Sequence, residues 1–380
     1  MTTERAYRYR FYPTPEQATL LARTFGCVRF VWNAVLRYRT DAFYQRQEKI
    51  GYHDASAFLT QLKKQPDTAF LTEVSSVPLQ QCLRHQQTAF KHFFAKRARY
   101  PHFKSKKHRQ SATFASSAFS YRNGQITLAK CREPLNIRWS RDLPSAPSTV
   151  TVSKDRAGRY FISCLCKVDT EALPITPNMV GIDLGLKDLF VTSEGPRVNN
   201  PRHTARYARK LARAQRQLSR KQKGSNNRAK ARLKVAKCHA KIADTRRDHL
   251  HQLTRQIVND NQVIAAESLQ VKHLVKNRHL SKAISDVGWG ELVRQLEYKA
   301  AWAGRQFVQI DRWYPSSKRC HGCGFVREAL PLDVRVWDCP GCGTQGIDRD
   351  LNAARNILQA GTALLAGAES CSKYRGALGN

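Results

Sequence analysis

Two CxxC pairs constrain the fold of this chain more than any other feature of its sequence. Cys320-His-Gly-Cys323 and Cys339-Pro-Gly-Cys342 are separated by 15 residues, and a glycine follows each second cysteine. Such glycines permit the tight turn that brings both thiolates of a pair to one metal ion. Four thiolates at this spacing are typical of tetrahedral zinc, and a closed four-cysteine site leaves no coordination position for a substrate. The sequence therefore predicts one structural Zn ion, with His321 as a bystander.

The charge of the chain is the second constraint. The 380 residues include 65 Lys and Arg but only 29 Asp and Glu, a formal net charge of +36. Self-repulsion of this size destabilises a compact fold unless a polyanion neutralises it, so nucleic acid is the expected partner, with an anionic membrane surface as the alternative. No apolar stretch approaches the ~18 residues that a spanning helix needs, and the N-terminal segment lacks the apolar core of a signal peptide. We therefore expect a cytoplasmic protein that binds nucleic acid and no membrane.

Many of the basic side chains lie in one segment, 202–247, which holds 17 Lys or Arg and a single acid, Asp244. Apolar residues recur there at helical spacing, in one stripe over 207–218 and another over 233–257, with a turn signal at 224–227. We expect an antiparallel helical hairpin over about 202–258 that binds the phosphate backbone without reading sequence, although a solvated charged face is the alternative. The candidate contacts are Arg209, Lys210, Arg213, Arg216, Arg220, Lys221, Lys230 and Arg232.

A second basic run, 91–109, contains aromatic residues between its cations. Tyr100, His102 and Phe103 surround Pro101 in what reads as a loop, and stacking on unpaired bases is one interpretation of them. Burial in a hydrophobic core is the alternative for the preceding Phe93 and Phe94. The candidate phosphate contacts of this run are Lys104, Lys106, Lys107 and Arg109.

The pattern of the remaining residues divides the chain in two. A strand is expected over 5–12, followed by a helix that Thr14 caps, with helical periodicity continuing to about residue 96. Short β-like runs follow, and a proline-bearing linker at 172–178 marks a boundary. The second half alternates strands and helices, as in an α/β layer fold with a largely buried sheet.

Three carboxylates stand at the margins of the strands and helices in this second half. Asp183 lies in the apolar strand MVGIDLG, and Glu267 ends the apolar run VIAAE, where α/β sheets place their ligands. Either acid alone could be a satisfied structural residue. Brought together with Asp350, they would repel one another unless divalent ions neutralised them. Two Mg²⁺ ions, or Mn²⁺, would do so and would stabilise the attacking and leaving oxygens of phosphodiester cleavage.

The stretch IDRDLNAARNIL offers two aspartates, and helix phase separates them. If a helix begins near residue 350, Asp350 shares the small apolar face of Ala354 and Ile357, which we expect to pack on the sheet. Asp348 would project with Asn352 and Arg355 toward solvent. Asp350 is therefore the predicted metal ligand, and Asp348 the predicted capping or supporting residue.

These segments together resemble the TnpB (OrfB) proteins of bacterial insertion sequences, which are related to type V CRISPR nucleases. FYPTPEQATLLARTFGCVRFVWN is similar to the N-terminal segment of that family. GIDLGLKDL, AAESL and IDRDLNAARNI resemble its three RuvC nuclease motifs, and WYPSSKRCHGCG with CPGCG resembles its zinc ribbon. Ile347 departs from the pattern, because the family often has histidine at that position.

The resemblance implies a multidomain α/β protein. An RNase H-like RuvC nuclease domain over 173–360 would contain the basic hairpin and a zinc ribbon inserted at about 315–345. A β-barrel wedge domain would precede it, formed by 1–14 and 99–172, with a helical recognition lobe at 15–98 and a flexible tail at 361–380. Asp183, Glu267 and Asp350 would be the catalytic, Mg-binding acids.

The resemblance also implies the activity: a guide RNA transcribed from the transposon end, and cleavage of complementary double-stranded DNA beside a short target-adjacent motif. The protein would act as a monomer on its RNA, in the bacterial cytoplasm and on the nucleoid. Three alternatives remain open. They are a guide-bound repressor with a silent site, a strand-transfer transposase, and an RNA-independent junction resolvase.

Overall fold

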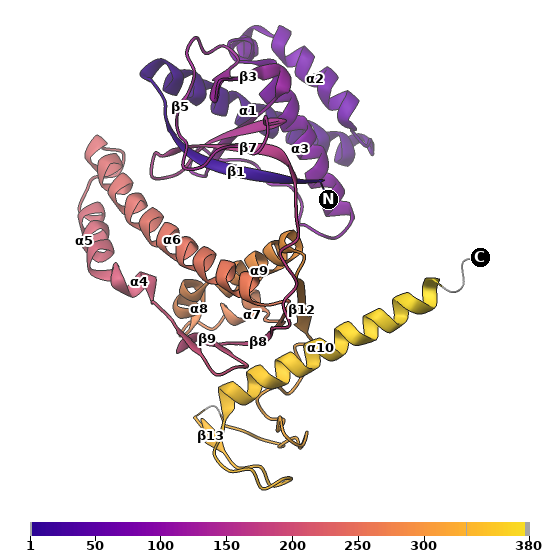
Figure 1. Cartoon of the computed structure of the whole chain (residues 1–380). Helices are drawn as coiled ribbons and strands as arrows, with labels where there is room; N and C mark the ends of the chain where they lie inside the picture. The colour runs from indigo at the N-terminus through magenta and orange to yellow at the C-terminus, as the bar shows by residue number, and fades with distance from the viewer. Residues whose placement is uncertain (1, 332, 377–380) are drawn as a thin grey trace. The chain divides into compact units, whose positions relative to one another are not determined.

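The first strand and helix form as the sequence predicts in the computed structural model, which describes residues 2–331 and 333–376 (Figure 1). β1 (Thr2–Tyr12) leads into α1 (Pro15–Arg46). The Thr14 hydroxyl accepts a hydrogen bond from the backbone N–H of Gln17 at 3.2 Å, and the Gln17 side chain accepts one from the backbone N–H of Thr14 at 3.1 Å. This capping box, with Pro15 in the first turn, confirms the predicted helix start.

Contacts within the chain divide it into two compact units, Met1–Asp169 and Thr170–Asn380. The division falls close to the boundary expected at 172–173. The remaining elements of the first unit are α2 (Tyr52–Lys64), α3 (Ser76–Phe94), two 3₁₀ turns (Pro66–Thr72 and Ser116–Ala118), β2 (Gln110–Ala115), β3 (Phe119–Arg122), β4 (Gln125–Leu128), β5 (Asn136–Arg138), β6 (Thr149–Lys154) and β7 (Tyr160–Asp169).

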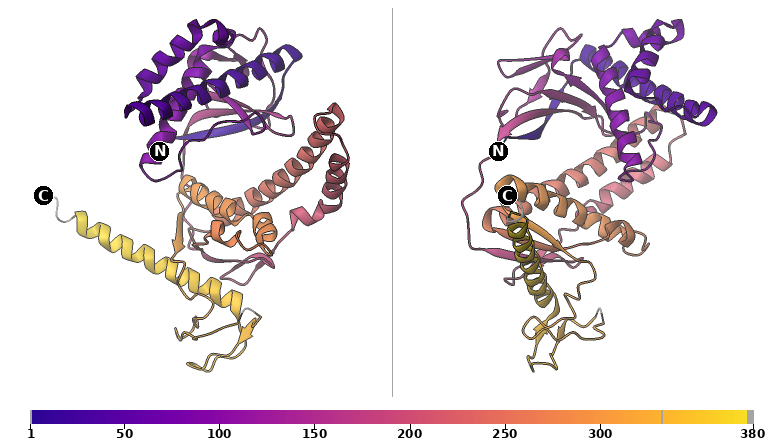
Figure 2. Two further views of the ribbon diagram at one scale, coloured as in Figure 1. Left: turned by 180° about the vertical axis from the view of Figure 1, so that it is seen from behind. Right: turned by 90° about the vertical axis from the view of Figure 1, so that its right-hand side faces the viewer.

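In the first unit, an antiparallel sheet and three long helices share one hydrophobic core. The strand order is β2-β6-β7-β1-β5, and β3 pairs with β4 in a separate hairpin. Figure 2 shows the helices gathered on one face of this sheet. Tyr9 and Ile162 of the sheet lie in the same buried cluster as Val31 and Leu83 of the helices. Because the helices supply a large part of that core, the expected helical lobe and β segments form a single compact unit.

The second unit is built on a mixed sheet in the order β10-β9-β8-β11-β12. β8, β11 and β12 are parallel, and β9 and β10 continue the sheet in antiparallel register. The elements are β8 (Met179–Leu184), β9 (Asp188–Thr192), β10 (Arg197–Asn199), β11 (Val263–Glu267), β12 (Gln306–Ile310), β13 (Val336–Trp337), β14 (Ile347–Asp348), α4 (His203–Arg206), α5 (Ala208–Ser219), α6 (Asn226–Asp260), α7 (Val271–Leu274), α8 (Ser281–Val287), α9 (Trp289–Ala303) and α10 (Arg349–Gly376).

Helices cover both faces of this sheet, which is why its central strands are apolar apart from the acids near their carboxyl ends. Successive residues of a strand point to opposite faces. Ile264 of β11 packs in the cluster formed with α6, α8 and α9, whereas the next residue, Ala265, packs against Ile357 of α10. Figure 1 shows α10 crossing the sheet strands. A sheet buried on both sides confirms the α/β layer expected from the sequence.

A glycine allows α10 to lie directly on β8. A Cβ built at Gly181 would lie 2.1 Å from the carbonyl oxygen of Ala354 and 2.8 Å from the backbone nitrogen of Leu358. Both are backbone atoms of a helix, so they cannot move aside as a flexible side chain would. Close approach of helix to strand at this point therefore requires glycine.

Gly181→Ala is expected to destabilise the second unit by about 2–4 kcal/mol, because α10 must shift off the sheet to admit the methyl group. Gly290→Ala in α9 is the matched control, since a Cβ there has no heavy atom within 4 Å. That control should gain up to about 1 kcal/mol from helix propensity. Denaturant unfolding followed by circular dichroism measures both, and equal midpoints for Gly181→Ala and the parent chain would contradict the close packing.

Two expectations about the second unit need correction. The buried residues of α6 are Ala231, Cys238, Ile242, Leu250, Thr254 and Val258, whereas Leu233, expected in the apolar stripe, is 39% exposed. The helix is covered by α5 along one part and by α9 along another, so its buried face is set by those neighbours.

The sequence also predicts a tail over 361–380, but α10 continues through Gly376, and residues 377–380 lie outside the described residues.

Candidate active site and four-cysteine cluster

Two of the predicted acids lie at the carboxyl ends of strands, and the third lies at the start of a helix. Asp183 is near the end of β8, Glu267 is the last residue of β11, and Asp350 is in the first turn of α10. The parallel register pairs Ile182 with Ala266, so the next residue of each strand, Asp183 and Glu267, reaches the same edge of the sheet. A Glu267 carboxylate oxygen accepts a hydrogen bond from the backbone N–H of Leu184 at 3.2 Å.

All three carboxylates line one pocket of about 330 Å³. Its other polar lining residues are Lys187, Asp188, Ser316, Ser317, Arg335 and Arg349. Within the described residues, Asp183 and Glu267 make no ion pair with a basic side chain. Across that part of the chain, the only group of three or more possible metal ligands whose atoms all lie within 4.8 Å is the four-cysteine set. The three acids therefore share a pocket, but their carboxylate oxygens do not all lie within 4.8 Å of one another.

Burial changes the acidity of the two strand carboxyls. It raises the pKa of Glu267 to about 7, against the opposing effect of the hydrogen bond from Leu184. It also raises the pKa of Asp183 well above its usual value, and the negative charges of Glu267 and Asp350 raise it further. Two carboxyls with raised pKa values, neither in an ion pair among the described residues, are groups that a bound cation would stabilise in their ionised form.

The pH dependence of stability follows from the raised pKa of Glu267. Between the unfolded value of 4.5 and about 7, the folded state holds a proton that the unfolded state has released. Stability of the metal-free protein should therefore fall as pH rises through this window, by at most about 3 kcal/mol from Glu267. Mg²⁺ should restore it, increasingly as the carboxyls ionise. Thermal melts at about pH 5 and about pH 8, with and without Mg²⁺, measure this, and Glu267→Gln should show a smaller change.

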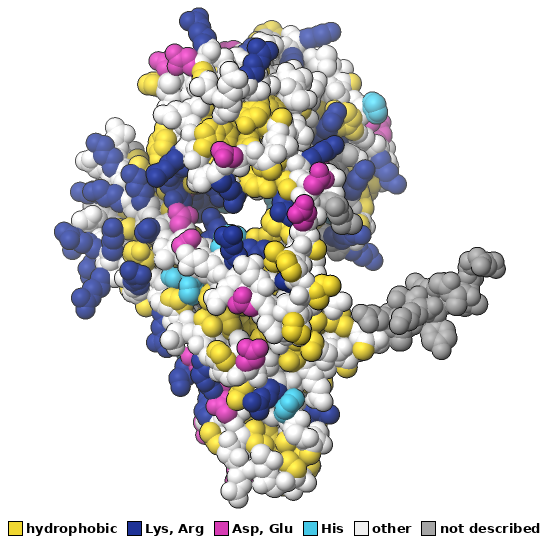
Figure 3. All heavy atoms as spheres, viewed as in Figure 1, with side chains coloured by type: hydrophobic (Ala, Val, Ile, Leu, Met, Phe, Trp, Pro, Cys, Tyr) yellow, Lys and Arg dark blue, Asp and Glu magenta, His cyan; other side chains and the backbone are white. Residues whose placement is uncertain are grey.

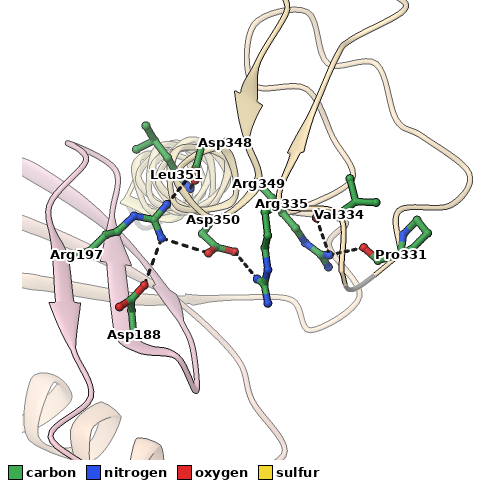
Figure 4. A network of polar contacts seen from close by, with 9 residues as sticks. All are labelled: Asp188, Arg197, Pro331, Val334, Arg335, Asp348, Arg349, Asp350 and Leu351. Atoms are coloured by element: carbon green, nitrogen blue, oxygen red, sulfur yellow. Dashed lines mark hydrogen bonds and ion pairs between the residues drawn. The ribbon is translucent and has the colours of Figure 1, made fainter.

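Asp350 and Asp348 share Arg197 as a partner but differ in their other contacts (Figure 4). One oxygen of Asp348 accepts from the backbone N–H of Leu351 at 2.8 Å and so caps α10, while the other pairs with Arg197 at 2.6 Å. The oxygens of Asp350 are bonded to guanidinium groups, Arg197 at 3.3 Å and Arg335 at 3.4 Å. Asp348 thus has the geometry of a capping residue, and Asp350 faces the pocket.

The expected orientation of Asn352 toward solvent is wrong. Asn352 is 4% exposed and Asn356 is fully buried. Both donate through their side-chain amides to the carbonyl oxygen of Arg319, at 2.7 and 2.6 Å, and the Asn352 side chain accepts from the backbone N–H of His321. α10 therefore packs on the sheet with one face and holds the cysteine-bearing segment with another. Two asparagines spaced i, i+4 in a helix of small apolar residues are the sequence signal for this second contact.

The four predicted cysteines form one cluster, built from two matching turns. Cys320 donates its N–H to the carbonyl of Phe325 and accepts from Gly324, and Cys339 does the same with Thr344 and Gly343. Gly324 and Gly343 have φ values of +79° and +71°, which explains why glycine follows each pair. The Sγ atoms lie 3.8 Å apart for Cys320 and Cys342, and 3.5 Å for Cys323 and Cys339. Four sulfurs bound tetrahedrally at ~2.3 Å would be about 3.8 Å apart.

The predicted helical hairpin is confirmed as α5 and α6, which pack together. The basic residues predicted on it are exposed, and Figure 3 shows Lys and Arg side chains gathered over these helices. Arg209, Arg213, Arg216 and Arg220 follow one another at helical spacing on α5 and its C-cap, and within the described residues none of them pairs with an acid.

Two residues of the basic run in the first unit, Lys104 and Arg109, make contacts within the protein that the sequence does not predict. The ammonium of Lys104 lies 3.7 Å from the ring centroid of Trp32, and Asn33 exchanges two hydrogen bonds with the Lys104 backbone. Arg109 donates to the hydroxyl of Ser153 at 3.2 Å. Lys106 and Lys107 are exposed. Lys104 therefore has a structural partner that neither composition nor spacing indicates.

No helix in the described part of the chain has an apolar stretch long enough to cross a membrane. Three family models match: OrfB of the insertion-sequence type, described as "Probable transposase", over residues 162–278; a "Cas12f1-like, TNB domain" over 289–357; and a "Helix-turn-helix domain" over 1–48. In the structure, the described part of 1–48 holds β1 and the long helix α1.

Comparison with known proteins covers nearly the whole chain. A Streptomyces pristinaespiralis protein named "Putative RNA-guided DNA endonuclease" is 57% identical over 95% of this chain and 90% of its own length. The Escherichia coli K12 protein "Putative RNA-guided DNA endonuclease InsQ" is 33% identical over 97% of this chain and 95% of its own length.

A solved structure resembles the fold. The Cas12f1 chain in a complex with guide RNA and target DNA superposes with a TM-score of 0.57 and 13% identity, over 94% of this chain and 98% of that chain. Identity this low supports the fold alone. The extent and identity of the two sequence matches are sufficient to assign the family: the chain belongs to the TnpB (OrfB) family of RNA-guided DNA endonucleases.

Proposed function

We propose that this protein cleaves double-stranded DNA complementary to a guide RNA, beside a short target-adjacent motif, with Asp183, Glu267 and Asp350 as its catalytic acids. The observation that carries the proposal is the shared pocket of these three carboxylates, two of which form no ion pair within the described residues. The relatives described above bear the name of this activity over nearly the full length of the chain.

Divalent cations fit the acidic pocket. Carboxylate oxygens are the ligands that Mg²⁺ and Mn²⁺ prefer, and Asp183 and Glu267 have raised pKa values that a cation would lower. Bound there, two Mg²⁺ ions would supply Lewis-acid stabilisation of the phosphodiester. The chain's own residues align the site: the backbone N–H of Leu184 orients Glu267, and the cap by Asp348 fixes the first turn of α10, which bears Asp350.

One zinc ion fits the four-cysteine cluster, because the sulfur spacing matches a tetrahedral four-thiolate site. All four ligand positions would be protein sulfurs, so its role is structural. The segment that carries the cysteines, between β12 and α10, is then a zinc ribbon inserted in the nuclease domain.

We also propose a fold family for the second unit and domain roles for the first. The order β10-β9-β8-β11-β12, with three parallel strands and helices on both faces, supports an RNase H-like RuvC domain for the second unit. For the first unit we propose the wedge and recognition roles. Its sheet is five-stranded with a separate hairpin, so closure into a barrel stays a prediction.

The partners proposed are one guide RNA and one DNA duplex, bound by a monomer in the bacterial cytoplasm. The net charge of +36 suits a long nucleic-acid channel. With one set of acids, both DNA strands would be cut in turn at the same site. Strand-specific labels that show both cuts at once would argue against this order.

The function is tested by sequencing the RNA that co-purifies with the protein and then offering DNA that matches it. Cleavage of matched DNA in Mg²⁺, but not of mismatched DNA or in EDTA, is the expected result. Binding of matched DNA without cleavage would indicate a repressor, and joined transposon–target products would indicate a transposase. Cleavage of junctions by protein free of RNA would indicate a resolvase.

The basic face of α5 should set the salt dependence of guide RNA binding. Replacing Arg209, Arg213, Arg216 and Arg220 by Gln should weaken binding and reduce the slope of log K against log salt by up to about 4, roughly one for each phosphate that is no longer neutralised. Filter binding over a salt series measures the slope. Four arginines that pair with surface acids, Arg23, Arg37, Arg46 and Arg294, are the control set, and an equal loss of slope there would reject a specific role for α5.

A further inference from the structure

Arg197 contacts three carboxylates at once, as Figure 4 shows. It begins β10, the strand beside β9 at the edge of the sheet. Its Nη2 donates to Asp348 at 2.6 Å, and its Nη1 reaches Asp188 and Asp350 at 3.3 Å each. A guanidinium in this position neutralises part of the acidic pocket in the metal-free protein.

The three contacts are not equivalent. The Asp348 pair is short, as charge-assisted hydrogen bonds are, and the other oxygen of Asp348 is committed to capping α10. The two longer contacts share one nitrogen. Asp350 has only such long contacts within the described residues, 3.3 Å to Arg197 and 3.4 Å to Arg335, and its side chain receives no backbone hydrogen bond there. Asp350 is therefore the carboxylate that can change partner at least cost.

A divalent cation that enters the pocket meets Asp183 and Glu267, which form no ion pair among the described residues, and Asp350, which is loosely held. It can take Asp350 from Arg197 and Arg335 without disturbing the helix cap. Arg197 then remains on Asp348, and its positive charge stays a few ångströms from the cation. Two like charges at such a distance repel.

We propose that Arg197 is a positioning residue that holds Asp350 until a divalent cation replaces it, and that its charge sets the cation concentration at which the site fills. The inference rests on the proposed function, in which Asp350 is a ligand of the catalytic cation. Arg197 joins the β9–β10 edge of the sheet to the first turn of α10, so the frame of the site is the same before and after the exchange.

The test is direct Mn²⁺ binding to the full, RNA-free chain purified with zinc, followed by the electron paramagnetic resonance of free Mn²⁺. Arg197→Ala should bind Mn²⁺ about five- to tenfold tighter, because one positive charge near a divalent ion is removed. Arg197→Lys keeps the charge but loses the planar guanidinium that contacts three acids at once, so about a two- to threefold gain in Mn²⁺ affinity is expected. Thermal melts verify that each variant is folded.

Arg294→Ala is the matched control. Arg294 pairs with Glu291 on α9, and neither residue lines the pocket, so its replacement should leave Mn²⁺ affinity unchanged. A wild-type or weaker affinity in both Arg197 variants overturns the inference.

The Asp350→Asn variant distinguishes two negative results: that Arg197 does not control cation binding, and that the proposed cation site does not exist. If Asp350→Asn binds Mn²⁺ as the parent chain does, Asp350 is not a ligand and the proposed site itself is wrong. If it binds more weakly while the Arg197 variants are not tighter, the cation site stands and only the role of Arg197 is rejected. A lower half-saturating Mg²⁺ concentration for DNA cleavage by Arg197→Ala would support the same conclusion as the binding measurement.

Discussion

Asp350→Asn is expected to reduce cleavage of guide-matched DNA by on the order of a thousandfold, because the proposed catalytic site would lose one charged ligand of its divalent cations. Asp348→Asn is expected to retain far more activity. Asparagine is as good a helix cap as aspartate, so the hydrogen bond to the N–H of Leu351 survives and only the ion pair with Arg197 is removed. Replacement of a supporting residue of this kind costs about 10–100-fold.

The two variants differ from the parent by the same isosteric change, two positions apart, so each serves as the control of the other. Initial cleavage rates at saturating guide RNA and Mg²⁺ give the comparison, with DNA binding measured in parallel to show that the complexes form. A normal rate for Asp350→Asn together with an inactive Asp348→Asn would reverse the assignment of the two aspartates.

Loss of one cysteine of the cluster should unfold the ribbon and leave the rest of the second unit folded. The ribbon's own buried core is small: Cys320, Leu330, Trp337 and Cys339, with Val334 and Ile347 packed against it. A core of this size cannot hold a fold without a metal, and zinc binding free energies are about 10–16 kcal/mol in small zinc modules. Cys339→Ser should therefore lose zinc, and hydrogen exchange should rise across the ribbon while the sheet stays protected.

Activity should fall with the ribbon, because Arg335 and the partners of Asn352 and Asn356 lie in it, beside the first turns of α10. Cys131→Ser is the control, since Cys131 is partly buried in the first unit and, within the described residues, belongs to no metal-binding cluster. Metal analysis should give one zinc per chain for the parent and the control. Full zinc content in Cys339→Ser would show that the four cysteines are not the ligands.

Local signals in the sequence predict much of this fold. The box formed by Thr14 and Gln17, the turn at Ser225 that starts α6, and the glycines after each cysteine pair act within a few residues, so spacing alone reveals them. Asp183 and Glu267 lie close together because each is at or near the carboxyl end of a parallel strand, and these ends meet at one edge of the sheet.

Arg197 and the buried face of α6 could not be predicted in the same way. Arg197 is one of 65 basic residues, and its role depends on strand β10 reaching the start of a helix more than a hundred residues later. On α6, both possible faces contain apolar residues, and only the packing of α5 and α9 selects between them. Lys104 is a similar case, because its partner Trp32 is distant in the chain.

The packing of α10 on β8, β11 and β12 also fixes when a nuclease can exist during translation. Of the residues of the second unit, Asp183, Arg197 and the basic hairpin emerge from the ribosome before Glu267, the cysteines of the ribbon follow, and Asp350 emerges after all of them. A nascent chain that has reached β12 can display its cationic surface to RNA while lacking the third acid. With the proposed acids and basic contacts, the order of synthesis thus separates the onset of nucleic-acid binding from the onset of cutting.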